Sequence, residues 1–410
     1  MTIFIDYTGA IFLIVLSYLV PLLFSSIRSQ KYCLTAFYVV TTALHFVSLF
    51  NYAIFTLPGV DLDATTFSNN ALGAAASGNA PVLSVGTNAY EYILYLAYTV
   101  FGENKLVGQA LSILTSVTSC LFLFGIARHL NIKGNFSILL LIIAGFTPSF
   151  LFYMSLTFRE AFQLFGFIGG IYYAYESFSN KSLASLFVSS LFFVFMGIFH
   201  HILLGLSFIL IVITFVFYFM SSGLSKKQII KNMILAIMGI SVIGYIVMVN
   251  IPAREGNDYI RKLRESGSVV KMVDQYRDRV EKNLPRSTYG FKVDTSSLAG
   301  AGYGLVISYL HYLYGPGIHS IDKAIDIVPA LNAFGRLLVS LLLLYLFIKR
   351  VRMPEGLGYL LIMYFIVTAM WSLGTTNYGQ AFRHNSLTDW ILAIVLVIGI
   401  KAALFREKDK

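Results

Sequence analysis

The sequence predicts an all-α, polytopic membrane protein with about 11 transmembrane helices. Of its 410 residues, 57% are hydrophobic and only 12% are charged, whereas a soluble domain averages about 25% charged residues. Long, nearly uncharged runs recur along the chain, for example 111–127 and 202–220. Each is close to the roughly 20 residues that a helix needs to cross the hydrocarbon core. The runs are continuously apolar, whereas the strands of a membrane barrel alternate.

The predicted spans follow one another with short connections between most of them. In chain order they cover 9–26, 34–56, 106–127, 135–153, 161–178, 183–199, 202–221, 230–250, 327–348, 357–373 and 389–405. Three regions result: a transmembrane module over 1–250 whose first outer loop is 57–105, an external loop over 251–326, and C-terminal transmembrane helices over 327–410. Within the external loop, the apolar stretch 302–314 is too short to span, so we expect re-entrant or interfacial helices there.

Basic residues in the short connections set the predicted orientation. Lysines and arginines recur at 28–31, 128–133, 181, 226–231 and 349–352 and in the C-terminal tail. Because such loops stay in the cytoplasm, we expect the N-terminus outside and the C-terminus in the cytoplasm. The charge of segment 251–300 conflicts with this orientation. The segment is predicted to lie outside, yet it contains ten Lys/Arg and seven Asp/Glu. The net charge of +10 comes largely from the short loops, so we expect no nucleic-acid partner.

Two carboxylates directly after the second predicted span are the candidate catalytic acids. Asp61 and Asp63 would stand at the bilayer surface, where a carboxylate is costly to desolvate without a role. Asp63 is followed at intervals of four by Phe67 and Ala71, which would place all three on one face of a helix. This spacing favours Asp63 as the working acid. The plainer alternative is that the pair solvates a loop or caps a helix.

Arginines, histidines and aromatic residues gather on the same predicted outer face. The candidate phosphate ligands are Arg159, His200, Arg336, Arg383 and His384, and the candidate substrate-lining residues are Glu160, Tyr92, His311 and Tyr314. An arginine fork can hold a phosphate through two hydrogen bonds, although an interfacial arginine can also simply reach lipid headgroups. Arg336 lies within the predicted ninth span, where a buried arginine must pair or face water.

The order of these motifs resembles the GT-C superfamily of integral-membrane glycosyltransferases, which use polyprenyl-linked sugar donors. The resemblance covers about residues 30–180 and rests on the Asp63, Phe67, Ala71 spacing, on 92–102, and on Thr147-Pro148-Ser149 before 156–160. Downstream, the chain is similar to bacterial O-antigen and exopolysaccharide polymerases at Arg159, Phe199-His200, Tyr314-Gly315-Pro316 and Gly379-x-x-x-Arg383.

The resemblance implies that Asp63, with Asp61 as second candidate, is the catalytic base or a metal-binding acid, so a divalent metal is an option. It implies that Arg159, His200 and Arg383 bind the lipid (pyro)phosphate. The chain departs from the superfamily in having Asp-Leu-Asp instead of the Asp-Glu pair of protein mannosyltransferases. No large soluble C-terminal domain follows the last predicted span, so a lipid-linked glycan is expected as acceptor rather than a protein.

The expected partners are therefore a polyprenyl-linked sugar or oligosaccharide donor, a glycan acceptor, the lipid bilayer and other polysaccharide-assembly proteins. Two alternative functions remain. A lipid-linked oligosaccharide flippase or transporter would need polar groups that continue through the midplane, and usually repeated halves. An O-antigen ligase would use the same donor class but join the glycan to the lipid A core.

Overall fold

The computed structural model describes residues 2–30, 32–57, 59–60, 63–223, 227–228, 288–289, 297–317, 320–321 and 323–405. Helices make up almost all of this part of the chain, which contains no strand and only an isolated bridge between Thr288 and Asn377. The all-α prediction is confirmed for these residues. The chain divides into two compact units, of which unit 1 holds 1–240, 353–357 and 403–410, and unit 2 holds 241–352 and 358–402.

Five helical segments among the described residues are long and apolar enough to cross a membrane. They are α3 (Cys33–Ala53), α6 (Lys105–His129), α11 (His201–Ser221), the segment Ala324–Ile348 formed by η4 (Ala324–Asp326) and α16 (Ile327–Ile348), and α17 (Leu357–Gly374). The number rises to 7 if each of two bent helix pairs is one span. The pairs are α7 (Asn135–Gly145) with α8 (Pro148–Met154), and α18 (Tyr378–Asn385) with α19 (Asp389–Phe405).

Every predicted span within the described residues coincides with a helix or a helix pair. The first corresponds to α1 (Thr2–Leu19) with the short η1 (Val20–Leu23) and α2 (Ser25–Arg28), and the fifth and sixth to α9 (Glu160–Asn180) and α10 (Leu183–Ile198). The eighth, 230–250, lies outside the described residues. Because α10 and the stretch Tyr7–Leu23 are shorter than a full span, the total of eleven stays a prediction.

The fourth predicted span, 135–153, is a broken helix, because α7 and α8 meet at a bend of 65°. Pro148 occupies the first turn of α8, and Thr147 before it has left the helical region with ψ 129°. A proline lacks the N–H that would continue the helix, and its ring disfavours a helical conformation of the residue before it. The sequence motif Thr-Pro therefore marks the break.

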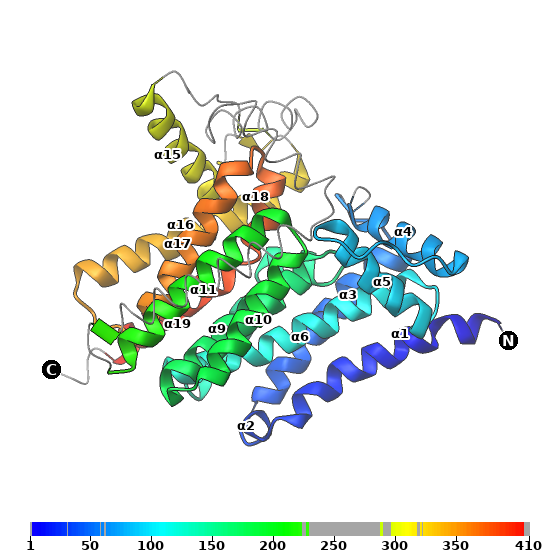
Figure 1. Ribbon diagram of the computed structural model, residues 1–410, viewed down its shortest axis with the longest axis horizontal. Coiled ribbons are helices and arrows are strands. Elements are labelled where there is room, and N and C mark those ends of the chain that lie inside the picture. The colour runs from blue at the N-terminus through cyan, green and yellow to red at the C-terminus, as the bar shows by residue number, and fades with distance from the viewer. Residues whose placement is uncertain are drawn as a thin grey trace. The chain divides into compact units, whose positions relative to one another are not determined.

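Unit 1 is built around α9, which packs against α10 and α6 (Figure 1). Glycines on α9 let α10 approach closely: a Cβ added at Gly166 would lie 2.7 Å from the backbone nitrogen of Met196, and one at Gly169 2.4 Å from the ring of Phe192. Unit 1 also contains the helical hairpin of α4 (Asp63–Ser77) and α5 (Thr87–Phe101), and α4 begins with the candidate acid Asp63. The first predicted outer loop is thus two helices.

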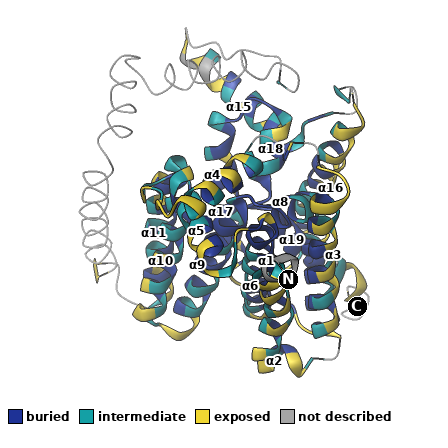
Figure 2. Ribbon diagram, turned by 90° about the vertical axis from the view of Figure 1, so that its right-hand side faces the viewer, coloured by how far each residue is buried: buried dark blue, intermediate teal, exposed yellow. Residues whose placement is uncertain are grey.

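Unit 2 consists of α15 (Leu298–Tyr314), α16, α17, α18 and α19. The helix expected over 302–314 is confirmed and begins earlier than expected, whereas its re-entrant character stays a prediction. Figure 2 shows α16 with a largely exposed face, and the exposed residues include Phe334, Leu338 and Leu341. An apolar face of this kind suits contact with lipid tails, as the class of protein requires.

Candidate functional site

The candidate catalytic acid Asp63 is the first residue of α4, and the predicted helical spacing after it is confirmed. Phe67 and Ala71 are both buried, whereas Asp63 itself is half-buried. One face of α4 therefore runs from a partly accessible carboxylate to an apolar contact surface. A carboxylate in the first turn also suits the positive end of the helix dipole. Asp61, the second candidate, lies outside the described residues.

Arg159 joins α4 to the start of α9 and the end of α10. Its Cζ lies over the ring of Phe67, 6.0 Å from the centroid, the separation at which a guanidinium is attracted to an aromatic face. Its Nη1 donates a hydrogen bond to the carbonyl of Phe199 at 3.2 Å. Asp63 precedes Phe67 by one helical turn on the same face. Arg159 thus contacts the face of α4 on which Asp63 lies.

A series of aromatic contacts, two edge-to-face and one tilted, lies behind the ring of Phe67. Phe67 contacts Tyr90 of α5 at 5.5 Å between centroids, Tyr90 contacts Phe162 of α9 at 5.6 Å, and Phe162 contacts Phe199 at 5.6 Å. Such pairs add stability beyond the area they bury. They hold four helix ends together, so Asp63 and Arg159 stand on a rigid support.

Tyr92, the predicted substrate-lining residue of α5, packs on Tyr95 at 6.1 Å, and it is Tyr90 that contacts Phe67. Residues two apart on a helix point to different faces, which explains why only one of the two tyrosines belongs to the aromatic series. Glu160 is buried in the first turn of α9, directly after Arg159. Its side chain is therefore enclosed by protein.

His200 lies next to the carbonyl that Arg159 binds, and it caps the N-terminus of α11. Its Nδ1 accepts a hydrogen bond from the backbone N–H of Ile202 at 3.2 Å. An accepting nitrogen carries no proton, so the proton of the neutral ring is on Nε2. The Nδ1 of His200 is thus committed to the cap of α11, while His200 itself directly follows the residue whose carbonyl Arg159 binds.

His201 is a further residue of this region that the sequence-based candidates leave out. A Cβ added at Gly86 would lie 3.1 Å from its Nε2, and Gly86 has a φ of +105°. The backbone N–H of Gly86 donates to the carbonyl of Ile198 at 2.8 Å. The His200-His201 dipeptide was the sequence signal that could have pointed to His201. The turn between α10 and α11 contacts the loop that leads into α5 at Gly86.

In unit 2, Arg336 forms a buried ion pair with Asp389. Its Nε is 2.7 Å from Oδ1 and its Nη2 3.3 Å from Oδ2, while Nη1 donates to the carbonyl of Leu313 at 3.2 Å. Asn332 donates to the same carboxylate at 3.1 Å. The sequence predicted that this arginine must pair or face water, and the structure shows that it pairs. These contacts engage all three nitrogens of the guanidinium, which indicates a structural role for Arg336 in pairing with Asp389.

The other candidates of unit 2 form aromatic contacts on α15 and α18. The ring of His311 stacks on Tyr289, with centroids 5.4 Å apart, and its Nδ1 is 3.4 Å from the hydroxyl of Tyr378. His384 stacks on Trp371 at 3.7 Å. Arg383, its neighbour on α18, is half-buried, as is Tyr314 at the end of α15. Both histidines have their rings engaged by protein.

The predicted residues therefore separate into two sets. Asp63, Arg159 and His200 come together in unit 1, while His311, Tyr314, Arg336, Arg383 and His384 belong to unit 2. No group of three or more His, Cys, Asp or Glu side chains suited to a metal ion occurs among the described residues, and a divalent metal stays a prediction. Comparison of the chain with protein-family models, with curated proteins and with solved structures gave no match.

Proposed function

We propose that this protein is an integral-membrane glycosyltransferase of the polysaccharide-polymerase type. It transfers a glycan from a polyprenyl-(pyro)phosphate donor to an acceptor glycan at the outer face of a bacterial inner membrane. The observation that supports this most directly is Arg159 over Phe67, with Asp63 one turn away on the same helix face. The eleven-span topology, with the N-terminus outside, belongs to the proposal because it puts this site on the outer face.

Asp63 acts as the general base. Its carboxylate accepts the proton of an acceptor hydroxyl while that oxygen attacks the anomeric carbon of the donor. The bond between the anomeric carbon and the phosphate oxygen breaks, and the lipid (pyro)phosphate departs with the electron pair. General-base help of this kind contributes about 10²–10⁴-fold to the rate. The direct displacement inverts the configuration of the anomeric carbon.

Arg159 stabilises the negative charge that develops on the departing phosphate. Fixed donors aimed at developing charge are worth more than mobile ones, because they need no reorganisation during the reaction. The contacts to Phe67 and to the carbonyl of Phe199 supply that fixation. The Nε2–H of His200 is a second donor for the same phosphate, since its Nδ1 is committed to the α11 cap.

Purified protein in liposomes tests the proposal. The vesicles receive a radiolabelled undecaprenyl-pyrophosphate-linked oligosaccharide from the source organism and an unlabelled acceptor of the same kind. We expect a lengthened lipid-linked glycan and released undecaprenyl pyrophosphate. Movement of the labelled lipid between leaflets without any new glycosidic bond would overturn the proposal in favour of a flippase. Transfer that occurs only when lipid A core is supplied would overturn it in favour of a ligase.

A further inference from the structure

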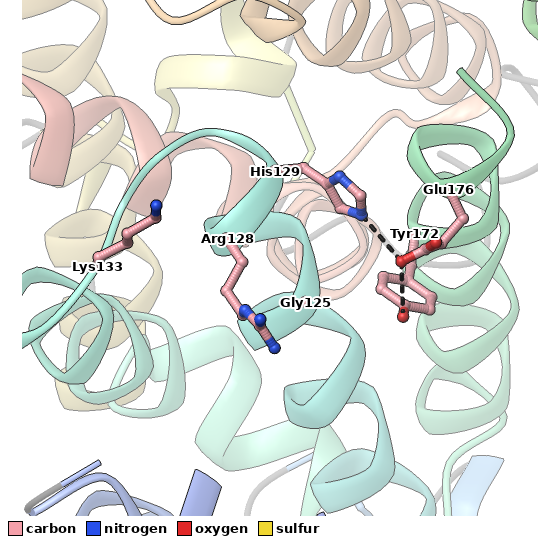
Figure 3. Close-up of a pocket in the computed structure, with 6 residues that line it drawn as sticks. All are labelled: Gly125, Arg128, His129, Lys133, Tyr172 and Glu176. Carbon is pink, nitrogen blue, oxygen red and sulfur yellow. Dashed lines mark hydrogen bonds and ion pairs between the residues drawn. The ribbon is translucent and has the colours of Figure 1, made fainter. Parts of the chain in front are cut away.

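A cavity of about 310 Å³ lies where α6 ends beside the C-terminal half of α9. Gly125, Arg128 and His129 of α6 line it together with Lys133 of the following loop, and Tyr172 and Glu176 of α9 lie across from them (Figure 3). The volume is at the lower end of the roughly 300–1,000 Å³ of small-molecule sites. It suits a compact polar group better than a whole lipid.

The one carboxylate of the cavity is already satisfied by its neighbours. Oε1 of Glu176 accepts from the hydroxyl of Tyr172 and is paired with Nε2 of His129, both at 3.1 Å, and Oε2 accepts from Asn180 at 2.7 Å. Figure 3 shows the contacts of Glu176 with His129 and Tyr172 on one side of the cavity. Glu176 is thus held by three groups of its own surroundings.

The two strongest cations of the cavity, Arg128 and Lys133, have no such partner. Within the part of the chain that the structure describes, neither side chain forms a hydrogen bond or an ion pair. Both side chains are exposed at the mouth of the cavity. The cavity therefore presents a fork of donors and a point charge to an incoming anion, the combination that binds phosphate groups.

The position along α9 indicates where that anion comes from. Glu176 lies 17 residues after Arg159, which is about 25 Å along a helix and close to the roughly 30 Å of the hydrocarbon core. The residues 128–133 belong to a connection that the sequence predicts on the cytoplasmic side. Basic pockets between transmembrane helices on that side bind the headgroups of anionic lipids.

We propose that this cavity binds the phosphate of an anionic phospholipid headgroup from the inner leaflet. The guanidinium of Arg128 takes two phosphate oxygens, and the ammonium of Lys133 takes a third. The inner-leaflet assignment rests on the topology of the proposed function, whereas the site does not depend on the glycosyl transfer itself. The plainer explanation is that basic residues gather at any cytoplasmic helix end, where they set orientation and suit the helix dipole.

Native mass spectrometry of the full-length protein tests the proposal, with phosphatidylglycerol and phosphatidylcholine titrated separately. We expect the wild type to bind phosphatidylglycerol at least about tenfold more tightly than phosphatidylcholine. The double variant R128Q/K133Q should lose this preference by roughly tenfold, which is the effect of about 1.4 kcal/mol. The matched control K349Q/R352Q removes the same charge from the exposed end that follows α16 and should keep the preference.

The variant Glu176→Gln distinguishes binding from damage to the fold, because it removes the only negative charge of the cavity lining. Tighter binding of phosphatidylglycerol is expected, and a misfolded protein would not give it. Unchanged preference in R128Q/K133Q would overturn the proposal, as would equal losses in that variant and in K349Q/R352Q. Displacement of phosphatidylglycerol by inorganic phosphate at millimolar concentration would overturn the assignment to a lipid.

Discussion

The guanidinium of Arg159 lies over the ring of Phe67, with 6.0 Å between Cζ and the ring centroid. This contact fixes the start of α9 against the face of α4 that begins with Asp63. The proposed base and the proposed phosphate ligand, which the sequence separates by nearly 100 residues, thereby share α4 as a support. The roles of Asp63 and Arg159 can each be tested by a separate substitution.

Asp63→Asn should abolish formation of the lengthened glycan in the liposome assay while the protein still folds, because an amide cannot accept the proton. The expected loss is about 10²–10⁴-fold. The matched control is Glu103→Gln, which neutralises an exposed carboxylate of the same outer segment. Product formation by Asp63→Asn at the rate of that control would contradict the role of Asp63 as base.

Arg159→Lys should retain part of the transfer rate, whereas Arg159→Gln should lose nearly all of it. Lysine keeps the charge but not the planar fork that stacks on Phe67 and reaches the carbonyl of Phe199. The measurement is the single-turnover rate at saturating donor. Lys105→Gln, which removes a cation from the same outer segment, should leave the rate unchanged. Wild-type rates in both Arg159 variants would show that Arg159 has no part in leaving-group stabilisation.

Asp389→Asn should destabilise the protein strongly, because it leaves the charge of Arg336 buried without its counter-ion. Breaking a buried pair on one side costs about 3–5 kcal/mol, and Tm in detergent is the measurement. The double variant R336M/D389L should recover much of the loss, since apolar groups of similar volume can replace such a pair. Glu355→Gln, at an exposed carboxylate, is the control, and a Tm for Asp389→Asn equal to that of Glu355→Gln would contradict the prediction.

Gly86→Ala should lower Tm, because the backbone at φ +105° strains an alanine and the new Cβ would lie 3.1 Å from Nε2 of His201. Strained conformations of this kind cost about 1–3 kcal/mol each. Gly73→Ala is the matched control with the opposite sign: it lies within α4 with nothing within 4 Å, and alanine favours a helix by about 1 kcal/mol. Equal shifts for the two variants would refute the close contact at His201.

Tyr98 should contribute to the alkaline limit of stability. Its hydroxyl is buried against Ser68 at 2.8 Å, and burial raises the pKa of Tyr98 to about 12. An unfolded tyrosine ionises near pH 10, so the contribution is complete below pH 10 and is lost as the pH rises to about 12. The Tm of the wild type should therefore fall more steeply between pH 10 and about 12 than the Tm of Tyr98→Phe. Parallel Tm-versus-pH curves for the two proteins would contradict the contribution of Tyr98.

How much the sequence could predict differs from one element to another. The face of α4 followed from the four-residue spacing after Asp63, because a helix obeys its own period regardless of its neighbours. The pairing of Arg336 with Asp389 did not follow, because nothing local marks a partner 53 residues away. Only the need for some partner was predictable, from the cost of an unpaired charge in an apolar span.

The cavity beside α9 was missed for a related reason. Glu176 lies inside the predicted span 161–178, and an acid within such a span was itself a signal of a functional or paired residue. The helical interval of four between Tyr172 and Glu176 places them on one face. What the sequence could not supply was the end of α6 next to that face, since helix packing depends on contacts distant in the chain.

The chain order of Arg336 and Asp389 has a consequence for the biogenesis of the protein. Ribosomes synthesise α16 before α19, so Arg336 emerges from the ribosome ahead of its counter-ion, which lies 53 residues later in the chain. An arginine at the centre of an inserting helix costs about 2.5–3.5 kcal/mol on the biological scale. The apolar remainder of α16 must offset this cost until α19 arrives, so the final helix also completes the insertion of an earlier one.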